Sequence, residues 1–240
     1  MGESKRQALA GLTPGLFDHH GAAGKGDAPR IDLAPGAAYM PRRALIVAPE
    51  LLAEVETIAA HAAFRRMSTP GGRPMSVGMT NAGVAGWVTD EHGYRFASRD
   101  PMTDRPWPPM LDLFKDVARS AAEAAGFAGF TPNACVINRY EPGARMTLHQ
   151  DRNEQDFRHP IVSVSLGLPA VFEFGGLERS DPTVRRTLEH GDVVVWGGPA
   201  RLCFHGVRPI EAGRHPATGP CRINLTFRVA RSDDRGLRPR

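Results

Sequence analysis

The sequence predicts one α+β domain in which two helices come first and a β-rich half follows. Apolar residues recur at helical spacing over 50–67 and again over 110–125. Beyond Gly126, short apolar runs are separated by turn residues such as Gly175-Gly176. Many short strands with turns between them are typical of a sandwich, a jelly roll or a barrel.

The helical spacing of the first segment rests on Leu52, Val55 and Ile58, and Arg65 and Arg66 are expected near its C-terminal end, where cations suit the helix dipole. The second helix is expected to end at Gly126, a suitable residue just past a helix end. Residues 75–96 are expected to form short strands and turns. The candidate strands of the second half are Ala134–Tyr140, Ile161–Leu166, Ala170–Phe174, Thr187–Glu189, Val193–Trp196, Leu202–Val207 and Arg222–Val229.

Bulk composition is that of a globular protein. The chain has 240 residues, 41% of them hydrophobic, and no apolar run approaches the length of a membrane span. Residues 1–40 are rich in Gly, Ala, Pro and charge, and are expected to form a flexible arm before a domain at 41–230 and a basic tail at 231–240. The three cysteines show no C-x-x-C spacing, which favours free thiols and a cytoplasmic location. We expect a monomer with no membrane association.

The net charge of +4 lies in the two ends, because residues 44–230 contain 20 basic and 20 acidic side chains. A sequence pI near 9.3 is compatible with a nucleic-acid partner. Two solvated tails explain it equally well, so charge alone leaves both interpretations open.

A metal site is indicated by His149, Asp151 and His205. On an extended segment, side chains at i and i+2 leave the same face, so His149 and Asp151 converge on one ion. His205 lies 54 residues further along, in another strand-like segment. Two imidazoles and one carboxylate form the facial triad of non-haem iron(II). A zinc hydrolase and a non-catalytic metal-binding β module are alternatives with the same ligands.

The segment from Arg222 to Val229 alternates strictly between polar and apolar residues. One interpretation is a strand whose polar face meets water. The other places Arg222, Asn224, Thr226 and Arg228 inside a barrel. Arg222 and Arg228 then stand roughly 20 Å apart along the strand, with side chains that lean toward one pocket. Paired arginines suit a dicarboxylate such as 2-oxoglutarate, and Asn138 and Tyr140 are candidates for added hydrogen bonds.

These motifs together resemble a known family. N-x-Y at Asn138 and Tyr140, H-x-D at His149 and Asp151, the distal His205 and R-x-N-x-x-x-R at 222–228 are similar to the AlkB family of DNA dealkylation dioxygenases. So are the longer strings STPGGRPMSVGMTNAG, CVINRYEPGARMTLHQD, PIVSVSLGLPAVFEFGGLER, LEHGDVVVWGG and CRINLTFR. The similarity extends from about Leu45 to about Arg228.

The resemblance implies a double-stranded β-helix (jelly-roll) core over about 130–230 and a nucleotide-recognition lid over about 65–100. It implies Fe(II), 2-oxoglutarate and O2 as cofactor and co-substrates, and oxidative demethylation of bases such as 1-methyladenine and 3-methylcytosine. By matching positions, His149, Asp151 and His205 are the implied iron ligands. The implied 2-oxoglutarate pocket consists of Asn138, Tyr140, Arg222, Asn224 and Arg228.

Substrate contacts are implied for residues of the lid and of the loops near the metal. They are Thr69, Met79, Trp87, Tyr94, Arg152, Glu154 and Arg179. Trp87 is suited to stack on a cationic base, and Arg65, Arg66, Arg73, Arg145, Arg152 and Arg179 are candidates for phosphate contacts. Asn153 and Arg73 depart from the family pattern, which has an aspartate and a tyrosine there. The implied partner is alkylated DNA, with RNA or tRNA as the alternative.

Overall fold

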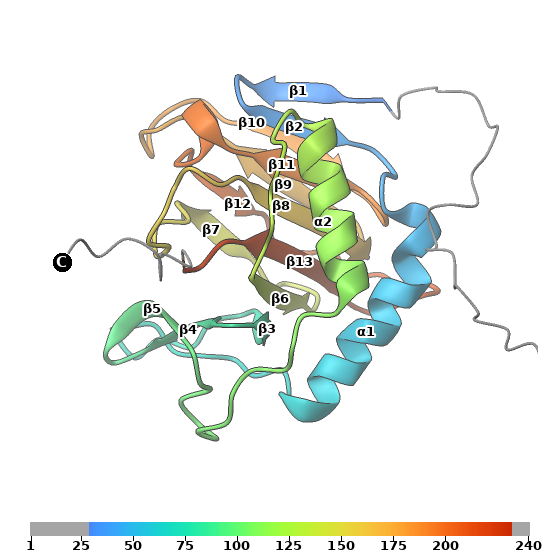
Figure 1. Cartoon of the computed structure of the whole chain (residues 1–240). Helices are drawn as coiled ribbons and strands as arrows, with labels where there is room; N and C mark the ends of the chain where they lie inside the picture. The colour runs from blue at the N-terminus through green and yellow to red at the C-terminus, as the bar shows by residue number, and fades with distance from the viewer. Residues whose placement is uncertain (1–28, 232–240) are drawn as a thin grey trace, which may run out of the picture.

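The structure is a computed structural model that describes residues 29–231. Two antiparallel sheets face each other, and two helices cover the outer side of the larger sheet (Figure 1). Most of the predicted arm, residues 1–28, and most of the predicted tail, residues 232–240, lie outside the described residues.

The larger sheet has seven strands in the order β1-β2-β11-β8-β13-β6-β3. Their bounds are β1 (Ile31–Ala34), β2 (Ala37–Met40), β3 (Gly78–Gly83), β6 (Ala134–Tyr140), β8 (Ile161–Gly167), β11 (Val193–Trp196) and β13 (Arg222–Arg228). The smaller sheet has four strands in the order β10-β9-β12-β7. These are β7 (Met146–His149), β9 (Ala170–Phe174), β10 (Val184–Leu188) and β12 (His205–Val207).

Apart from the β9–β10 hairpin, which stays in the smaller sheet, successive strands from β6 to β13 alternate between the two sheets, which is the connectivity of a jelly roll. The predicted fold class is therefore confirmed. The predicted bounds of β6, β9 and β11 match the structure, whereas β10 begins earlier than predicted and β12 is shorter. A separate hairpin of β4 (Gly86–Asp90) and β5 (Gly93–Ala97) follows β3.

Two α-helices pack on the outer face of the larger sheet, α1 (Ala48–His61) and α2 (Asp112–Ala124). Short 3-10 turns occupy Leu45–Val47 and Gly198–Ala200. The apolar face of β13 belongs to the same core cluster as the buried faces of both helices. Neither described α-helix is long and apolar enough to cross a membrane.

The prediction of a flexible arm does not hold for residues 31–40, which contain two strands. Strands β1 and β2 form a hairpin, and β2 pairs with β11, with Tyr39 opposite Val194. The Tyr39 hydroxyl donates to Asp192 at 2.8 Å, and the Arg42 amide donates to the same carboxylate at 2.8 Å. The strands are only four residues long, so their order comes from pairing with β11 and leaves little periodicity in the sequence.

The first helix ends at His61, earlier than predicted, and Arg65 and Arg66 are not helical. Arg65 forms a β-bridge with Met79, and the Thr80 hydroxyl donates to the Ala62 carbonyl at 2.6 Å. Pairing with β3 therefore replaces the last helical turns, since tertiary contacts outweigh weak local propensity. The second helix ends as predicted, with Gly126 at φ 91° just beyond it.

The contact between the helices and β13 gives a stability prediction. Phe227 is fully buried, and its ring meets Phe114 edge-on at 5.5 Å between centroids. Phe227→Ala is expected to lower the free energy of unfolding by about 3–5 kcal/mol through lost burial and a residual cavity. Val184→Ala, at a side chain that is 47% exposed, is expected to change it by no more than about 0.5 kcal/mol. Urea unfolding of both variants measures the difference, and equal effects would contradict this view of the core.

Candidate functional site

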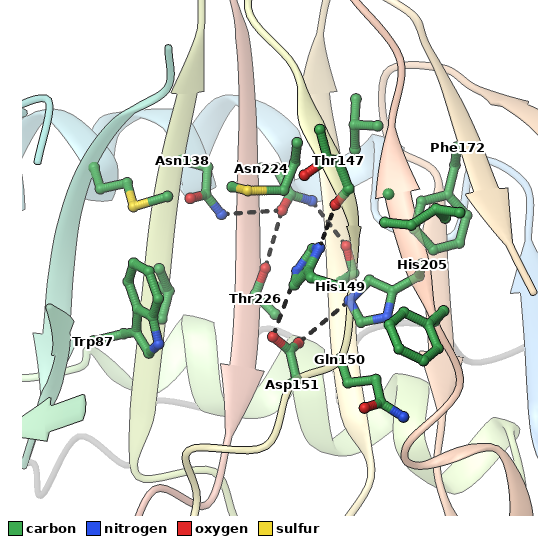
Figure 2. Close-up of a pocket in the computed structure, with 18 of the residues that line it drawn as sticks. Trp87, Asn138, Thr147, His149, Gln150, Asp151, Phe172, His205, Asn224 and Thr226 are labelled. Atoms are coloured by element: carbon green, nitrogen blue, oxygen red, sulfur yellow. Dashed lines mark hydrogen bonds and ion pairs between the residues drawn. The ribbon is translucent and has the colours of Figure 1, made fainter. Parts of the chain in front are cut away.

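Strand β13 brings its polar face into the space between the two sheets. All seven of its residues are buried, so the alternative with this face toward water was wrong. In the antiparallel register, Arg222 lies opposite Tyr140 and Asn224 lies opposite Asn138. Figure 2 shows Asn138, Asn224 and Thr226 pointing into the same cavity as the histidines.

The cavity has a volume of about 560 Å³. It collects residues from both sheets and from the β4–β5 hairpin. Fourteen of the fifteen predicted site residues line it.

Glu154 is the one predicted site residue that does not line this cavity. The lining includes the predicted metal ligands His149, Asp151 and His205, the predicted pocket residues Asn138, Tyr140, Arg222, Asn224 and Arg228, and Thr69, Met79, Trp87, Tyr94, Arg152 and Arg179. The fold thus brings residues that are distant in sequence into one cavity.

The three candidate metal ligands meet because β12 pairs with β7, which places His205 opposite His149. Asp151 follows two residues after the end of β7. Its carboxylate lies 3.7 Å from Nε2 of His149 and 3.5 Å from Nε2 of His205. One ligand atom from each residue lies within 4.8 Å of the others, which is compact enough to surround a single ion.

Both imidazoles are oriented by backbone carbonyl groups. Nδ1 of His149 lies 2.9 Å from the Thr147 oxygen, and Nδ1 of His205 lies 3.0 Å from the Cys203 oxygen. Because a carbonyl oxygen only accepts, each Nδ1 carries the proton and each Nε2 presents its lone pair toward Asp151. Outer hydrogen bonds of this kind fix the tautomer and orientation of metal-ligating histidines.

The protonation states also suit a cation. Loss of hydration in the cavity, followed by the nearby His205, lowers the pKa of His149 to about 4. Burial alone would raise the pKa of Asp151, but the positive charge of Arg228 outweighs it and holds the pKa well below its ordinary value. At neutral pH, His149 is therefore neutral and Asp151 is ionised, as metal ligands must be. Two His and one carboxylate fit iron(II).

Arg222 is a buried cation without an anion. It is 1% exposed and forms no ion pair with any carboxylate among residues 29–231. Its guanidinium donates to Ser165 Oγ at 2.7 Å and to the Leu168 carbonyl at 3.4 Å, and its Nε has no hydrogen-bond partner. Burial lowers its pKa to about 10. An isolated buried charge is costly, so the donor set fits an anionic ligand such as a carboxylate.

Amide groups lie on the neighbouring strands. Asn138 Oδ1 is buried without a hydrogen-bond partner, and Asn138 Nδ2 donates to Asn224 Oδ1 at 3.5 Å. Asn224 is itself held by Ser163 and by the Val164 carbonyl, at 2.8 and 3.0 Å. Asn138 therefore keeps an open polar atom toward the cavity, while Asn224 holds Asn138 in place.

Arg228, the expected second clamp on a dicarboxylate, also pairs with two carboxylates of the protein. It lines the cavity, but its Nη2 lies 2.8 Å from Asp151 Oδ2 and its Nη1 donates to Glu154 Oε1 at 2.8 Å. The two carboxylates already balance its charge. Arg228 therefore holds the carboxylate of the candidate ligand Asp151 and also faces the cavity.

Glu154 was predicted as a substrate contact, and the structure places it elsewhere. Its side chain is fully buried between Arg228 and Arg201. Two nearby guanidinium groups explain this burial, because a carboxylate enters a protein interior only with cationic or hydrogen-bonding partners. Sequence reasoning missed Arg201 altogether.

The remaining predicted contacts surround the cavity on the side of the β4–β5 hairpin. The rings of Trp87 and Tyr94 are stacked, with centroids 5.8 Å apart. Asn153, a departure from the family pattern, accepts from Trp87 Nε1 at 2.9 Å and donates to the Tyr94 carbonyl at 3.3 Å. Asn153 thus links the β4–β5 hairpin to the loop that follows Asp151 through hydrogen bonds.

The predicted phosphate contacts separate into two groups. Arg152 and Arg179 line the cavity. Arg65 is half-buried against Asp100 at 2.6 Å, and Arg66 pairs with Glu141 at 2.5 Å. Arg73 is exposed and does not line the cavity. Arg152 and Arg179 are therefore the better placed for contact with a ligand that enters the cavity.

A jelly roll that holds two histidines and an aspartate beside a buried, unpaired arginine defines a class of enzymes, the non-haem iron oxygenases that use a keto acid. The chain belongs to the 2OG-Fe(II) oxygenase superfamily, whose family model matches residues 38–228. The protein is thus an Fe(II)- and 2-oxoglutarate-dependent dioxygenase.

Its relatives specify the branch of the superfamily. The chain is 59% identical to "Alpha-ketoglutarate-dependent dioxygenase AlkB" of Salmonella typhimurium and 54% identical to the protein of the same name from Escherichia coli. Each match spans 198 residues, 82% of this chain and 92% of the relative. The solved structure of OsALKBH1 superposes with a TM-score of 0.73 at 25% identity, over 84% of this chain and all of that one. The predicted AlkB family is confirmed.

The lowered pKa of His149 gives a prediction for the metal-free protein. The ordinary pKa of histidine is about 6.5, and the pKa of folded His149 is about 4. Between these two pH values, His149 is protonated in the unfolded state and neutral in the folded state. Acidification through this window therefore lowers the free energy of unfolding. His149→Gln is expected to make that decline shallower, and His61→Gln, at an exposed histidine, is expected to leave it unchanged.

Denaturant unfolding at a series of pH values with a chelator present measures the slopes. Parallel slopes for wild type and His149→Gln would contradict the assignment.

Proposed function

We propose that this protein removes alkyl groups oxidatively from damaged bases of DNA, of the 1-methyladenine and 3-methylcytosine type. One observation carries the proposal: the metal triad, the unpaired Arg222 and the stacked Trp87 and Tyr94 all line a single cavity. The metal, a carboxylate co-substrate and a flat aromatic substrate therefore have places beside one another. The similarity to enzymes named AlkB supports the same activity.

The roles divide between the sheets. Nε2 of His149, Nε2 of His205 and the Asp151 carboxylate would hold Fe(II), with two of these residues on strands of the smaller sheet. Arg222, Tyr140 and Asn138, on the larger sheet, would hold 2-oxoglutarate. When bound, Fe(II) with 2-oxoglutarate and O2 supplies the oxidant that hydroxylates the alkyl carbon, with CO2 and succinate as products and formaldehyde released from a methyl group.

The protein's own contribution is binding and exclusion of water. A methyl group on a base is buried within a duplex, so the base must leave the stack before it reaches the cavity. The Trp87 ring is suited to stack on a cationic base, which contributes on the order of 1–2 kcal/mol in a desolvated site. Arg152 and Arg179 stand at the same cavity, where guanidinium groups suit phosphates.

The working form is proposed to be a cytoplasmic monomer. All three metal ligands come from one chain, so no second subunit is needed to complete the centre. Cys135, Cys203 and Cys221 are unpaired, as thiols are in reducing compartments.

The proposed activity predicts a defined set of products. With Fe(II), ascorbate, 2-oxoglutarate and 1-methyladenine in single-stranded DNA, the protein is expected to release succinate and formaldehyde and to restore adenine. Omission of 2-oxoglutarate or replacement of iron by Zn(II) is expected to abolish the reaction. Mass spectrometry of the oligonucleotide measures repair, and an RNA of the same sequence is the comparison. Zinc-supported turnover without 2-oxoglutarate would indicate a hydrolase, and repair of the RNA alone would replace DNA with the alternative substrate, RNA.

The role of Arg222 is tested separately through affinity for 2-oxoglutarate. Arg222→Gln removes the buried cation, and loss of a buried charge partner typically costs about 2–5 kcal/mol of binding, or roughly 30-fold or more in dissociation constant. The fold is expected to be no less stable, because the lost charge had no counterion. Calorimetric titration of the Mn(II)-loaded protein measures the constant, and Arg208→Gln, a half-exposed arginine paired with Glu173, is the control. An unchanged constant would remove Arg222 from the pocket.

A further inference from the structure

Asp151 is the metal ligand with the least support from secondary structure. His149 closes β7 and His205 opens β12, whereas residues 150–160 contain no helix or strand. A carboxylate on irregular backbone would sample many positions, because fixing a backbone residue costs about 1–2 kcal/mol of conformational entropy. The segment around Asp151 therefore needs contacts of its own to stay in place.

Arg201 supplies these contacts from the segment that precedes β12. It is 3% exposed and lies four residues before His205. Its Nη1 donates to the Asp151 carbonyl at 2.7 Å, and its Nε donates to the His159 carbonyl at 3.0 Å. Its guanidinium also lies over the Phe157 ring at 5.3 Å. One side chain thus fastens the irregular segment near both ends and in the middle.

The same arginine closes a ring of charges around the ligand. Arg201 Nη2 lies 3.3 Å from Glu154 Oε1, and that oxygen also accepts from Arg228. Arg228 in turn meets the Asp151 carboxylate at 2.8 Å. Asp151 is therefore held at its carbonyl by Arg201 and at its carboxylate by Arg228, with Glu154 between the two cations.

A second cross-link runs in the other direction. Gln150, between the two ligands of the H-x-D motif, donates from Nε2 to the Leu202 carbonyl at 2.6 Å. The segment at 149–151 and the segment at 201–205 are thus joined by reciprocal side-chain-to-backbone bonds. These two segments carry all three metal ligands.

We propose that Arg201 is a positioning residue for the metal centre, which fixes the main chain at Asp151 so that its carboxylate meets the two imidazoles before metal binds. The inference rests on the metal centre of the proposed function. Arg201 touches neither metal nor substrate and acts through Asp151 and Glu154. Loss of an arginine that only filled space would lower stability and leave the metal affinity of the folded protein unchanged.

Metal affinity of the folded protein is the test. Arg201→Met keeps the length of the side chain and removes every hydrogen bond. Loss of a group that orients a metal ligand typically weakens metal binding by about 10- to 100-fold, and that range is expected for the Mn(II) dissociation constant measured by calorimetry with 2-oxoglutarate present. Arg201→Lys has one donor head and cannot reach all three acceptors, so its constant is expected to lie between those of wild type and Arg201→Met.

Two controls separate positioning from stability and from charge. Leu51→Ala removes a fully buried side chain of α1, is expected to destabilise the fold without contact to the site, and should bind Mn(II) as wild type does. Arg208→Met removes one positive charge from the outer surface and should do the same. Wild-type affinity in Arg201→Met, or in Arg201→Lys should Arg201→Met not fold, would overturn the proposal. Failure of the wild-type protein to bind Mn(II) or Fe(II) would instead overturn the metal centre itself.

Discussion

Strand β13 carries four polar side chains into the space between the two sheets, and the rest of the site depends on how their burial is balanced. Buried polar groups are tolerated only with partners. Asn224 and Thr226 form hydrogen bonds with other buried groups, and Arg228 forms ion pairs with Asp151 and Glu154. Arg222 has only Ser165 and a carbonyl. The imbalance at this single position is the reason we propose that the carboxylate of the co-substrate binds there, in the same cavity as the candidate metal ligands.

Regular local patterns made most of the fold predictable. Helical spacing located both helices, and short apolar runs located β6, β9 and β11 at their observed bounds. The pattern failed where order comes from a distant partner. The hairpin of β1 and β2 is short and is stabilised by β11 and by Asp192. The end of α1 is set by pairing of Arg65 with Met79. A single sequence carries no local signal for such pairings.

The residues of the site also separate into those that local sequence patterns predict and those that they do not. His149, Asp151, His205 and Arg222 were predictable because their chemistry requires particular residue types at particular spacings. The ion pairs of Arg228 and Glu154 were not predictable. The alternating pattern assigns a side chain to one face of a strand but does not identify its partner. Arg201 was missed for a further reason. Its main acceptors are backbone carbonyls of Asp151 and His159, and every residue has one, so sequence offers no complementary partner to find.

The architecture also explains why the two sheets must hold a fixed separation. Two of the ligands stand on adjacent strands of the smaller sheet, and Arg222 stands on the larger sheet. A bound keto acid that contacts both the metal and Arg222 would therefore span the interior. The apolar cluster around Phe172, Phe174 and Trp196 packs one side of that interior, and the Trp196 ring lies 4.8 Å from His205 between centroids. Because protein interiors are close-packed and deform little, this cluster holds His205 of the smaller sheet at a fixed position relative to the larger sheet.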